Sequence, residues 1–165
     1  MMDVFVEQIV AIKKTGKDFA AYVGIVLLSL ILMFIAYLFL TSVFIAVAAA
    51  VIFGAYKLFL RLNIEYEYIV TNGTMDIDKI IAKSSRKRMI SFDVSSIQRI
   101  EKYSGILPSN IEKECLFFCD KNDDNSFVVY YKEDGKQQKT FVFAPNERVR
   151  ESIKSILPRY VGEEL

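Results

Sequence analysis

The sequence predicts an α+β protein: an N-terminal two-helix transmembrane hairpin, then a seven-stranded antiparallel β-barrel or sandwich capped by a C-terminal helix. Three observations predict this fold class. Residues 19–56 contain no Asp, Glu, Lys, Arg or His; residues 62–143 show short alternating patterns separated by turn residues; and helical spacing of apolar residues returns after Asn146. The expected parts are an amphipathic segment at 1–18, the hairpin at 19–61, a cytoplasmic domain at 62–158 and a tail at 159–165.

The apolar run is long enough for two membrane spans. One spanning helix needs about 20 apolar residues, and the run is about twice that length. Thr41 and Ser42 form the only polar pair near its middle, so we place the reversal there, with spans at 19–40 and 43–60. A cleavable signal peptide is the competing interpretation. We reject it because its apolar region would be too long and because residues 51–60 are apolar again.

The flanking charges predict the orientation of the hairpin. Lys13, Lys14 and Lys17 precede the first span, and Lys57 and Arg61 close the second. Cytoplasmic flanks of spanning helices collect Lys and Arg. Two basic ends on one side require an even number of spans, so we expect a multi-pass protein of the cell membrane with both termini in the cytoplasm.

The segment before the first span has apolar residues at a spacing that suits a short helix. They are Val4, Phe5, Ile9 and Ile12. We expect an amphipathic helix on the inner membrane face, ended by Gly16, with Asp18 capping the first span. A partly ordered tail is the alternative.

Seven strands are expected after the hairpin, at about 64–70, 75–83, 86–92, 97–103, 114–119, 126–132 and 137–143. Asn72 and Gly73 between the first two favour a tight hairpin turn, because both residues accept positive φ. Glu65 and Glu67 alternate with apolar residues and are expected to face solvent. Residues 104–114 form a longer connection with one helical turn, and residues 120–125 and 133–136 form loops.

The last element is an amphipathic helix. Asn146 caps it, Pro158 stops it, and one face carries Val149, Ile153, Ile156 and Leu157. Residues 159–165 are expected to be loose. Four strands, a longer connection, three more strands and a capping helix are the element order of the pleckstrin-homology-like (PH-like) fold.

Part of the sequence also resembles known proteins. Residues 66–81, the run Arg86-Lys87-Arg88-Met89, and then Asp93 and Ile97 resemble a family of uncharacterised two-span membrane proteins from Firmicutes. More distantly, the hairpin followed by this pattern resembles the bacterial PH-like membrane proteins. The resemblance covers most of residues 19–103. It implies the fold and the membrane placement, and it brings no enzymatic activity with it.

Composition argues against several functional classes. The chain is 53% hydrophobic with a formal net charge of +1. Acidic and basic residues nearly balance after residue 62, which disfavours a nucleic-acid partner. Histidine is absent from the sequence, and we find no nucleophile motif or phosphate loop. Asp76 and Asp78 share one face of an exposed strand, where ordinary solvation is expected. We therefore expect neither an enzyme nor a cofactor.

Cysteine and acidic residues do not predict a metal site or a disulfide. Cys115 and Cys119 would lie about 13 Å apart along a strand, too far for a disulfide. Residues 120–125 begin like a calcium loop, but Asn125 stands where the loop glycine is required. The bidentate glutamate position is Tyr131. We expect two free thiols and a solvated loop.

Two groups of residues are candidates for binding. Lys83, Arg86, Lys87 and Arg88 surround a predicted turn and could contact lipid phosphates. The alternative is a solvated strand face balanced by Asp76 and Asp78. In the second span, Ala46, Ala50 and Gly54 form a small-residue surface for packing against the first span or another subunit.

The leading hypothesis is a membrane-anchored cytoplasmic PH-like interaction domain, non-enzymatic, that binds a protein partner or mediates assembly. One alternative is an accessory subunit of a membrane transport or secretion complex that acts through its helical hairpin. Another is an anionic-lipid sensor. The expected partners are the lipid bilayer and a protein or a second copy of the chain, and not nucleic acid.

Overall fold

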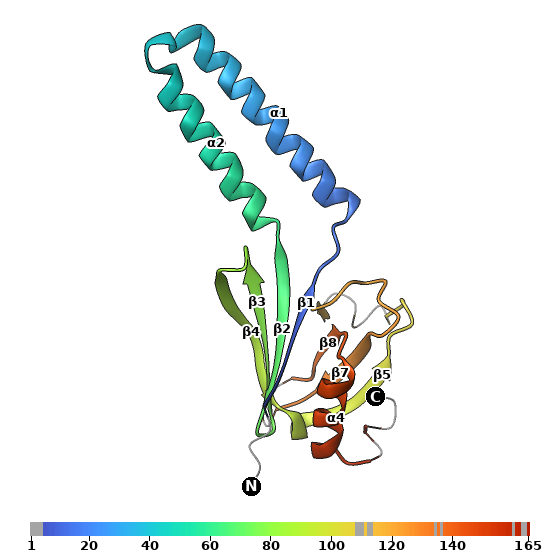
Figure 1. Ribbon diagram of the computed structural model, residues 1–165. Coiled ribbons are helices and arrows are strands. Elements are labelled where there is room, and N and C mark those ends of the chain that lie inside the picture. Colours follow the sequence, from blue (N-terminus) through green and yellow to red (C-terminus); the bar gives the residue numbers. More distant parts are fainter. Residues whose placement is uncertain are drawn as a thin grey trace. The chain divides into compact units, whose positions relative to one another are not determined.

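The computed structural model describes residues 5–107, 111, 114–133, 135, 137–159, 161–162 and 165 (Figure 1). The chain forms two compact units. The β-domain comprises Met1–Ile12, Glu65–Ile80 and Arg86–Leu165, and the hairpin unit comprises Lys13–Ile64 and Ile81–Ser85. Each unit is therefore built from segments that are not contiguous in sequence.

The hairpin unit contains two long antiparallel helices, α1 (Gly16–Phe39) and α2 (Phe44–Arg61). A short 3-10 turn, η1 (Thr41–Val43), joins them, so the reversal lies where Thr41 and Ser42 predict it. Both helices are long and apolar enough to cross a membrane, with mean hydropathy of 2.6 for α1 and 2.3 for Thr41–Arg61. The core helix of a soluble protein would be mostly buried. Here Ala36 is the only buried residue in the described helices of the hairpin.

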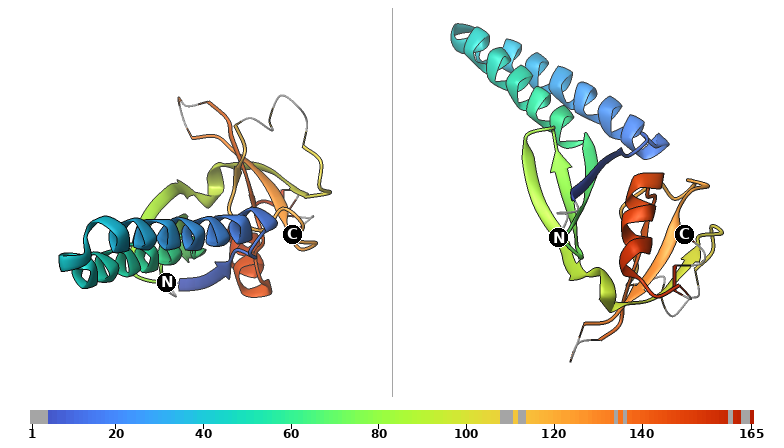
Figure 2. Two further views of the ribbon diagram at one scale, coloured as in Figure 1. Left: turned by 90° about the horizontal axis from the view of Figure 1, so that it is seen from above. Right: turned by 60° about the horizontal axis from the view of Figure 1, so that its bottom comes forward.

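Aromatic contacts join the two helices at both ends. The rings of Tyr22 and Phe59 stack with centroids 5.4 Å apart, and Tyr37 meets Phe44 edge to face at 5.9 Å. The helices run side by side between these contacts (Figure 2). Each aromatic pair adds about 0.5–1.5 kcal/mol to the packing, so the hairpin is fixed at its turn and at its open end.

The open end of the hairpin is also fixed by polar contacts. Asp18 Oδ2 accepts a hydrogen bond from the Thr15 backbone N–H at 2.7 Å, which places Asp18 in the first turn of α1 and makes Thr15 the N-cap. The prediction that Asp18 is itself the cap was wrong, because Asp18 is the third helical residue and reaches back to the cap. Lys14 Nζ donates to the carbonyl of Leu62 at 2.9 Å, which ties the segment before α1 to the segment after α2.

The β-domain contains eight strands in its described residues, arranged as two four-stranded sheets. The first sheet has the order β1-β2-β3-β4, and its strands are β1 (Phe5–Ala11), β2 (Ile64–Thr71), β3 (Thr74–Ile81) and β4 (Ser85–Asp93). The second has the order β5-β7-β8-β6, with β5 (Ile97–Lys102), β6 (Leu116–Phe117), β7 (Phe127–Tyr131) and β8 (Lys139–Phe143). The α+β class is as predicted. The strand count differs from seven, and β6 is parallel to β8.

The additional strand is β1, which the sequence predicted as an amphipathic helix. Val6 and Val10 pack against the core, and β1 pairs antiparallel with β2 through partners such as Gln8 and Tyr68. In the structure alternate residues of β1 are partly covered, although the sequence FVEQIVA places its apolar residues in pairs rather than at alternate positions. Tertiary pairing overrides the local helical spacing, because β1 completes a sheet whose next strand follows only after the hairpin. The hairpin is thus inserted between two neighbouring strands.

The C-terminal helix α4 (Glu147–Ile156) contacts β1 and the short turn η2 (Val94–Ser96). Asn146 caps it as predicted, since its Oδ1 accepts a hydrogen bond from Val149 N at 2.9 Å. Val149, Ile153 and Leu157 are buried in the core. The prediction of a loose tail was wrong: Val161 and Leu165 are 6% and 7% exposed and belong to the same core.

A polar clamp joins β1 and β2 to the segment that enters α4. The Tyr68 hydroxyl donates to the carbonyl of Phe118 at 2.7 Å and accepts from Ala144 N at 3.3 Å. Its partner across the strands, Gln8, donates to the carbonyl of Ala144 at 3.0 Å and accepts from Asn146 N at 2.7 Å. Burial raises the pKa of Tyr68, so its hydroxyl remains a donor at any physiological pH.

The first prediction concerns β1. Deleting residues 1–12 removes two apolar side chains from the core and both hydrogen bonds of Gln8. These terms sum to about 5 kcal/mol, comparable to the whole stability of a small domain. We expect this variant to be unfolded by circular dichroism. By contrast, replacing residues 13–63 with a short Asn-Gly turn keeps β1 and should give a soluble folded domain. A folded deletion variant would contradict the role of β1.

The second prediction concerns the clamp. Tyr68→Phe leaves the buried Phe118 carbonyl and Ala144 N–H without this partner and should lower the free energy of unfolding by about 2–3 kcal/mol. Tyr66→Phe is the matched control, on the same face of β2, and should change it by less than about 0.5 kcal/mol. Urea unfolding of the hairpin-replaced domain measures both. Equal effects of the two substitutions would show that the hydroxyl contacts of Tyr68 contribute nothing.

Candidate functional site

Two of the four basic residues predicted as a lipid contact, Arg86 and Arg88, form ion pairs with acidic side chains. Lipid contact by the cluster stays a prediction. Arg86 Nη1 lies 2.9 Å from Glu67 Oε2, and the Glu67 side chain is fully buried. Glu67 was predicted to face solvent on its strand, and this prediction was wrong. Its carboxylate lies on the face of β2 opposite the core residue Tyr68, where neighbouring side chains cover it.

Arg88 forms the second part of this ionic network. Its Nη2 lies 3.0 Å from Asp76 Oδ2, and its Nε donates to Asp78 Oδ1 at 3.2 Å. The aspartate side chains are only 20% and 11% exposed, so the expectation that they are ordinarily solvated was wrong. The expectation that they balance the basic cluster is confirmed for Arg88. Charge pairing with Arg88 explains how two carboxylates can lie together on β3. The contact with both carboxylates raises the pKa of Arg88, and the guanidinium stays charged.

The carboxyl of Glu67 has a shifted pKa. Burial raises the pKa of its carboxyl above the ordinary value of 4.5, the neighbouring carboxyl of Glu7 raises it further, and Arg86 acts in the opposite direction. Arg86 and Arg88 thus pair with three acidic residues of the first sheet, which are Glu67, Asp76 and Asp78. Of the four predicted cations, Lys87 is exposed on β4, while Lys83 lies in the turn between β3 and β4 with a φ of 55°.

A groove of about 340 Å³ opens between β4 and β8 in the β-domain. Its floor includes the buried side chains of Ile90, Tyr131 and Phe141. Its rim carries two exposed apolar residues, Met89 and Leu116, which are 37% and 43% exposed. We call this feature the β4–β8 groove. Its floor is formed by buried side chains and its rim by apolar ones, so it suits an apolar side chain of a ligand.

Among the strands that the structure describes, both walls of the β4–β8 groove have an edge without a neighbouring strand. β4 is the last strand of the first sheet. β6 pairs with β8 only at Phe141 and Val142, so within the described residues no strand pairs with this side of β8 at Lys139 and Thr140. Backbone N–H and C=O groups of such edges can pair with an added strand.

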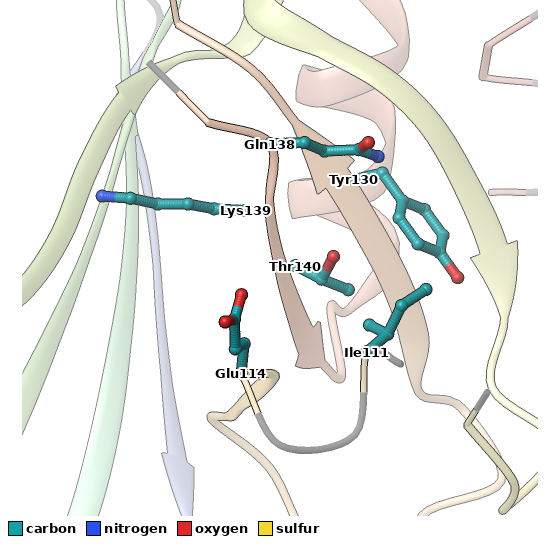
Figure 3. Close-up of a pocket in the computed structure, with 6 residues that line it drawn as sticks. All are labelled: Ile111, Glu114, Tyr130, Gln138, Lys139 and Thr140. Atoms are coloured by element: carbon teal, nitrogen blue, oxygen red, sulfur yellow. The ribbon is translucent and has the colours of Figure 1, made fainter. Parts of the chain in front are cut away.

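The start of β8 also borders a smaller hollow of about 270 Å³ on its other face (Figure 3). Gln138 and Thr140 lie on this side with Tyr130, whereas Lys139 points to the opposite side of the strand. The alternation gives the exposed start of β8 one charged face and one uncharged polar face. The sequence did not predict the groove; its one local signal is Met89 beside Ile90, apolar residues on opposite faces of a strand.

The small residues predicted for helix packing lie away from α1. Ala46, Ala50 and Gly54 are all exposed, and a methyl group added at Gly54 would meet nothing within 4 Å. The residues of α2 that are partly covered instead include Val47, Val51 and Ala55. Packing of Ala46, Ala50 and Gly54 against another subunit stays a prediction.

The thiols and the acidic loop show no feature of a reactive or metal-binding site. Cys115 and Cys119 are free, and burial raises the pKa of their thiols to about 11 and about 12. Asp123 Oδ1 accepts a hydrogen bond from Asn125 N at 3.0 Å, as in a self-capped turn. In the part of the chain that the structure describes, no three acidic or cysteine residues come together to hold a metal ion.

These features define an α+β domain that carries a helical hairpin of membrane-spanning length. Comparison with known families gives the same class: residues 2–163 match the family described as "Bacterial PH-like domain (DUF6106)". The chain belongs to this family of bacterial PH-like domains, as the resemblance predicted. No curated protein and no solved structure is significantly similar to it.

The third prediction concerns the buried carboxyl of Glu67. Because its pKa is raised in the folded state, its contribution to stability is fully present below about pH 4.5 and is lost as the pH rises through the folded pKa. We expect Glu67→Gln to remove this loss, so its unfolding free energy should fall less than that of the unsubstituted protein as the pH rises above 4.5. Urea titrations of the hairpin-replaced domain at several pH values measure the slope.

Glu65→Gln, two residues earlier on the same face of β2, is the control for this experiment. It removes an equal charge outside the Arg86 pair. Identical pH slopes for the Glu67 variant and the unsubstituted protein would contradict a raised pKa for Glu67.

Proposed function

We propose that this protein is a non-enzymatic, membrane-anchored PH-like domain that faces the cytoplasm and binds a protein partner. The partner contributes an extended segment that lies in the β4–β8 groove. The hairpin is the anchor in this proposal, and the basic residues on its outer flanks favour the cytoplasmic side for both ends of the chain.

The observation that carries the proposal is the coincidence of strand edges with an apolar floor. An added strand gains backbone hydrogen bonds from an edge, and alternate side chains enter pockets that give specificity. Here the edges of β4 and β8 flank Ile90 and Phe141, with Met89 at the rim. The favoured ligand is therefore an extended segment with apolar side chains at alternate positions.

The charged groups near the groove refine this expectation. Lys139 on β8 and the exposed Lys87 on β4 supply positive charge, and Glu114 supplies a negative one. An acidic residue of the bound segment could form an ion pair with Lys139 without being placed over the apolar floor. Charge of this kind acts mainly on association rate and on choice of partner, and the apolar contacts supply most of the affinity.

The fourth prediction tests the groove in native membranes. A photo-crosslinking amino acid at Met89 should capture a discrete partner in the full-length protein. Leu116→Glu should lower the captured amount at least fivefold, because it places a charge beside the buried floor. Ile106→Glu is the matched control, since Ile106 is an exposed apolar residue outside the groove, and it should leave capture unchanged.

Two results would contradict this proposal. Equal capture by the Leu116→Glu and control proteins would exclude the groove as the binding site. Loss of capture after exchange of residues 16–61 for an unrelated two-span hairpin would assign recognition to the hairpin.

The second candidate function is an accessory subunit that acts through its helices. One observation favours it: Ala46, Ala50 and Gly54 form an exposed face of α2, and small residues permit close helix approach. The hairpin exchange described above separates this function from groove binding, because it removes this face and leaves β1 and the groove intact.

A further inference from the structure

The hairpin unit contains an open cleft of about 620 Å³ at the end of α2. One wall is the last turn of α2, and the other is the connection between β3 and β4. The residues that matter for its chemistry are Lys57, Leu60, Arg61, Ile81, Ser84 and Ser85. None of these side chains takes part in the ionic network of Glu67, Asp76 and Asp78.

The turn that forms one wall is held in a fixed conformation. Ala82 N donates to the carbonyl of Asn63 at 2.9 Å, which attaches the turn to the segment after α2. Ser84 N donates to the carbonyl of Ile81 at 3.2 Å. Ala82 and Lys83 have φ values of 57° and 55°, in the left-handed region that disfavours residues with a side chain. A tight turn is kept here although its residues are not glycine.

The lining of the cleft combines basic, hydroxyl and apolar side chains. Lys57 and Arg61 lie one helical turn apart on α2, so their side chains emerge on the same side. Ser84 and Ser85 add hydroxyl donors, and Leu60 adds an apolar surface. Among the described residues that line the cleft, none is acidic. The lining therefore favours an anion that has an apolar part.

We propose that this cleft binds the phosphate group of an anionic phospholipid. Arg61 has the planar donor geometry that matches two phosphate oxygens, and Lys57 contributes a second positive charge on a flexible stem. The serine hydroxyls donate to the remaining oxygens, and Leu60 contacts the start of an acyl chain. The phospholipid source is favoured over a free phosphate because the cleft lies at the end of a helix of membrane-spanning length.

This inference rests on the proposed membrane anchoring and goes beyond it. It uses cations other than those the sequence pointed to. The sequence pointed to Lys83, Arg86, Lys87 and Arg88, of which Arg86 and Arg88 form ion pairs with acids, whereas the cleft uses Lys57 and Arg61 of α2. A lipid bound here would join the end of α2 to that turn.

The test uses the full-length protein in nanodiscs of phosphatidylcholine in which roughly one lipid in five is phosphatidylglycerol. Native mass spectrometry of the released protein counts the retained phosphatidylglycerol. Each cation near an anionic lipid contributes roughly fivefold in affinity. We therefore expect Lys57→Gln/Arg61→Gln to lower retention at least tenfold. Ser84→Phe removes a hydroxyl donor and places a bulky side chain in the cleft without a charge change, so it should also lower retention.

The matched control is Lys13→Gln/Lys17→Gln. These residues flank the other helix, so the control removes the same charge at the same end of the hairpin and leaves the cleft unchanged. It should retain phosphatidylglycerol as the unsubstituted protein does. If the control and the cleft variants lose phosphatidylglycerol equally, the proposal is overturned. That result would show that the lipid is held by general attraction to the basic ends of the helices and not by the cleft.

Two further measurements separate the remaining possibilities. The first distinguishes a soluble phosphate ligand from a phospholipid. The second tests whether the hairpin anchors the protein in the membrane at all. If glycerophosphate or inorganic phosphate displaces the retained lipid at millimolar concentration, the site is a soluble phosphate site and the lipid assignment is wrong. Extraction of the unsubstituted protein from membranes by alkaline carbonate would show that the proposed anchoring itself fails. If the protein stays anchored in the nanodisc and the cleft variants still retain phosphatidylglycerol, the lipid site in the cleft is contradicted and the membrane anchoring is not.

Discussion

The β-domain depends on one cross-strand pair, Gln8 on β1 and Tyr68 on β2. Both side chains reach the backbone between Ala144 and Asn146, which is the entry to α4. The bonds satisfy the backbone N–H and C=O of Ala144 and the N–H of Asn146 at the bend before α4. Because Asn146 is itself the cap of α4, the start of that helix is fixed by the first two strands. The helix then covers the core with Val149 and Ile153.

That arrangement has a consequence for the hairpin. β1 and β2 are neighbours in the sheet, yet the whole hairpin lies between them in sequence. The domain is therefore joined to the hairpin by two chain crossings rather than one flexible tether. Lys14 and Asn63 keep these two crossings together, and the ring stack of Tyr22 on Phe59 continues the contact into the helices. A folded domain thus requires that the hairpin ends be close.

The sequence predicted the local features of this fold and missed the ones that depend on distant partners. Asn72 and Gly73, with φ values of 46° and 94°, form the expected turn, and Asn146 forms the expected cap. Both follow from the conformational preferences of adjacent residues. β1 was missed because its partner strand follows a long insertion. The burial of the C-terminal tail was missed for the same reason, since Leu165 becomes buried only when the sheets have assembled.

At the candidate sites too, the sequence predicted the local features and missed those that depend on distant residues. The basic run at residues 86–88 was visible in the sequence, but its ion pairs were not, because the position of Glu67 opposite Arg86 depends on strand register. The β4–β8 groove requires two sheets to meet, so no single segment predicts it. Its apolar rim has a weak local signal in Met89, an exposed residue beside the buried Ile90.

Insertion between β1 and β2 also explains how such a long segment can be accommodated without loss of the fold. The entropy of closing a connection grows only slowly with its length, and a connection that is itself folded presents fixed ends. The helices of the hairpin pack on each other, and the Lys14 contact to the Leu62 carbonyl closes the base. What the β-domain requires from the insertion is therefore the spacing of its two ends. The composition of the helices is left to be set by whatever surrounds them, which accounts for the many large apolar side chains that both helices expose.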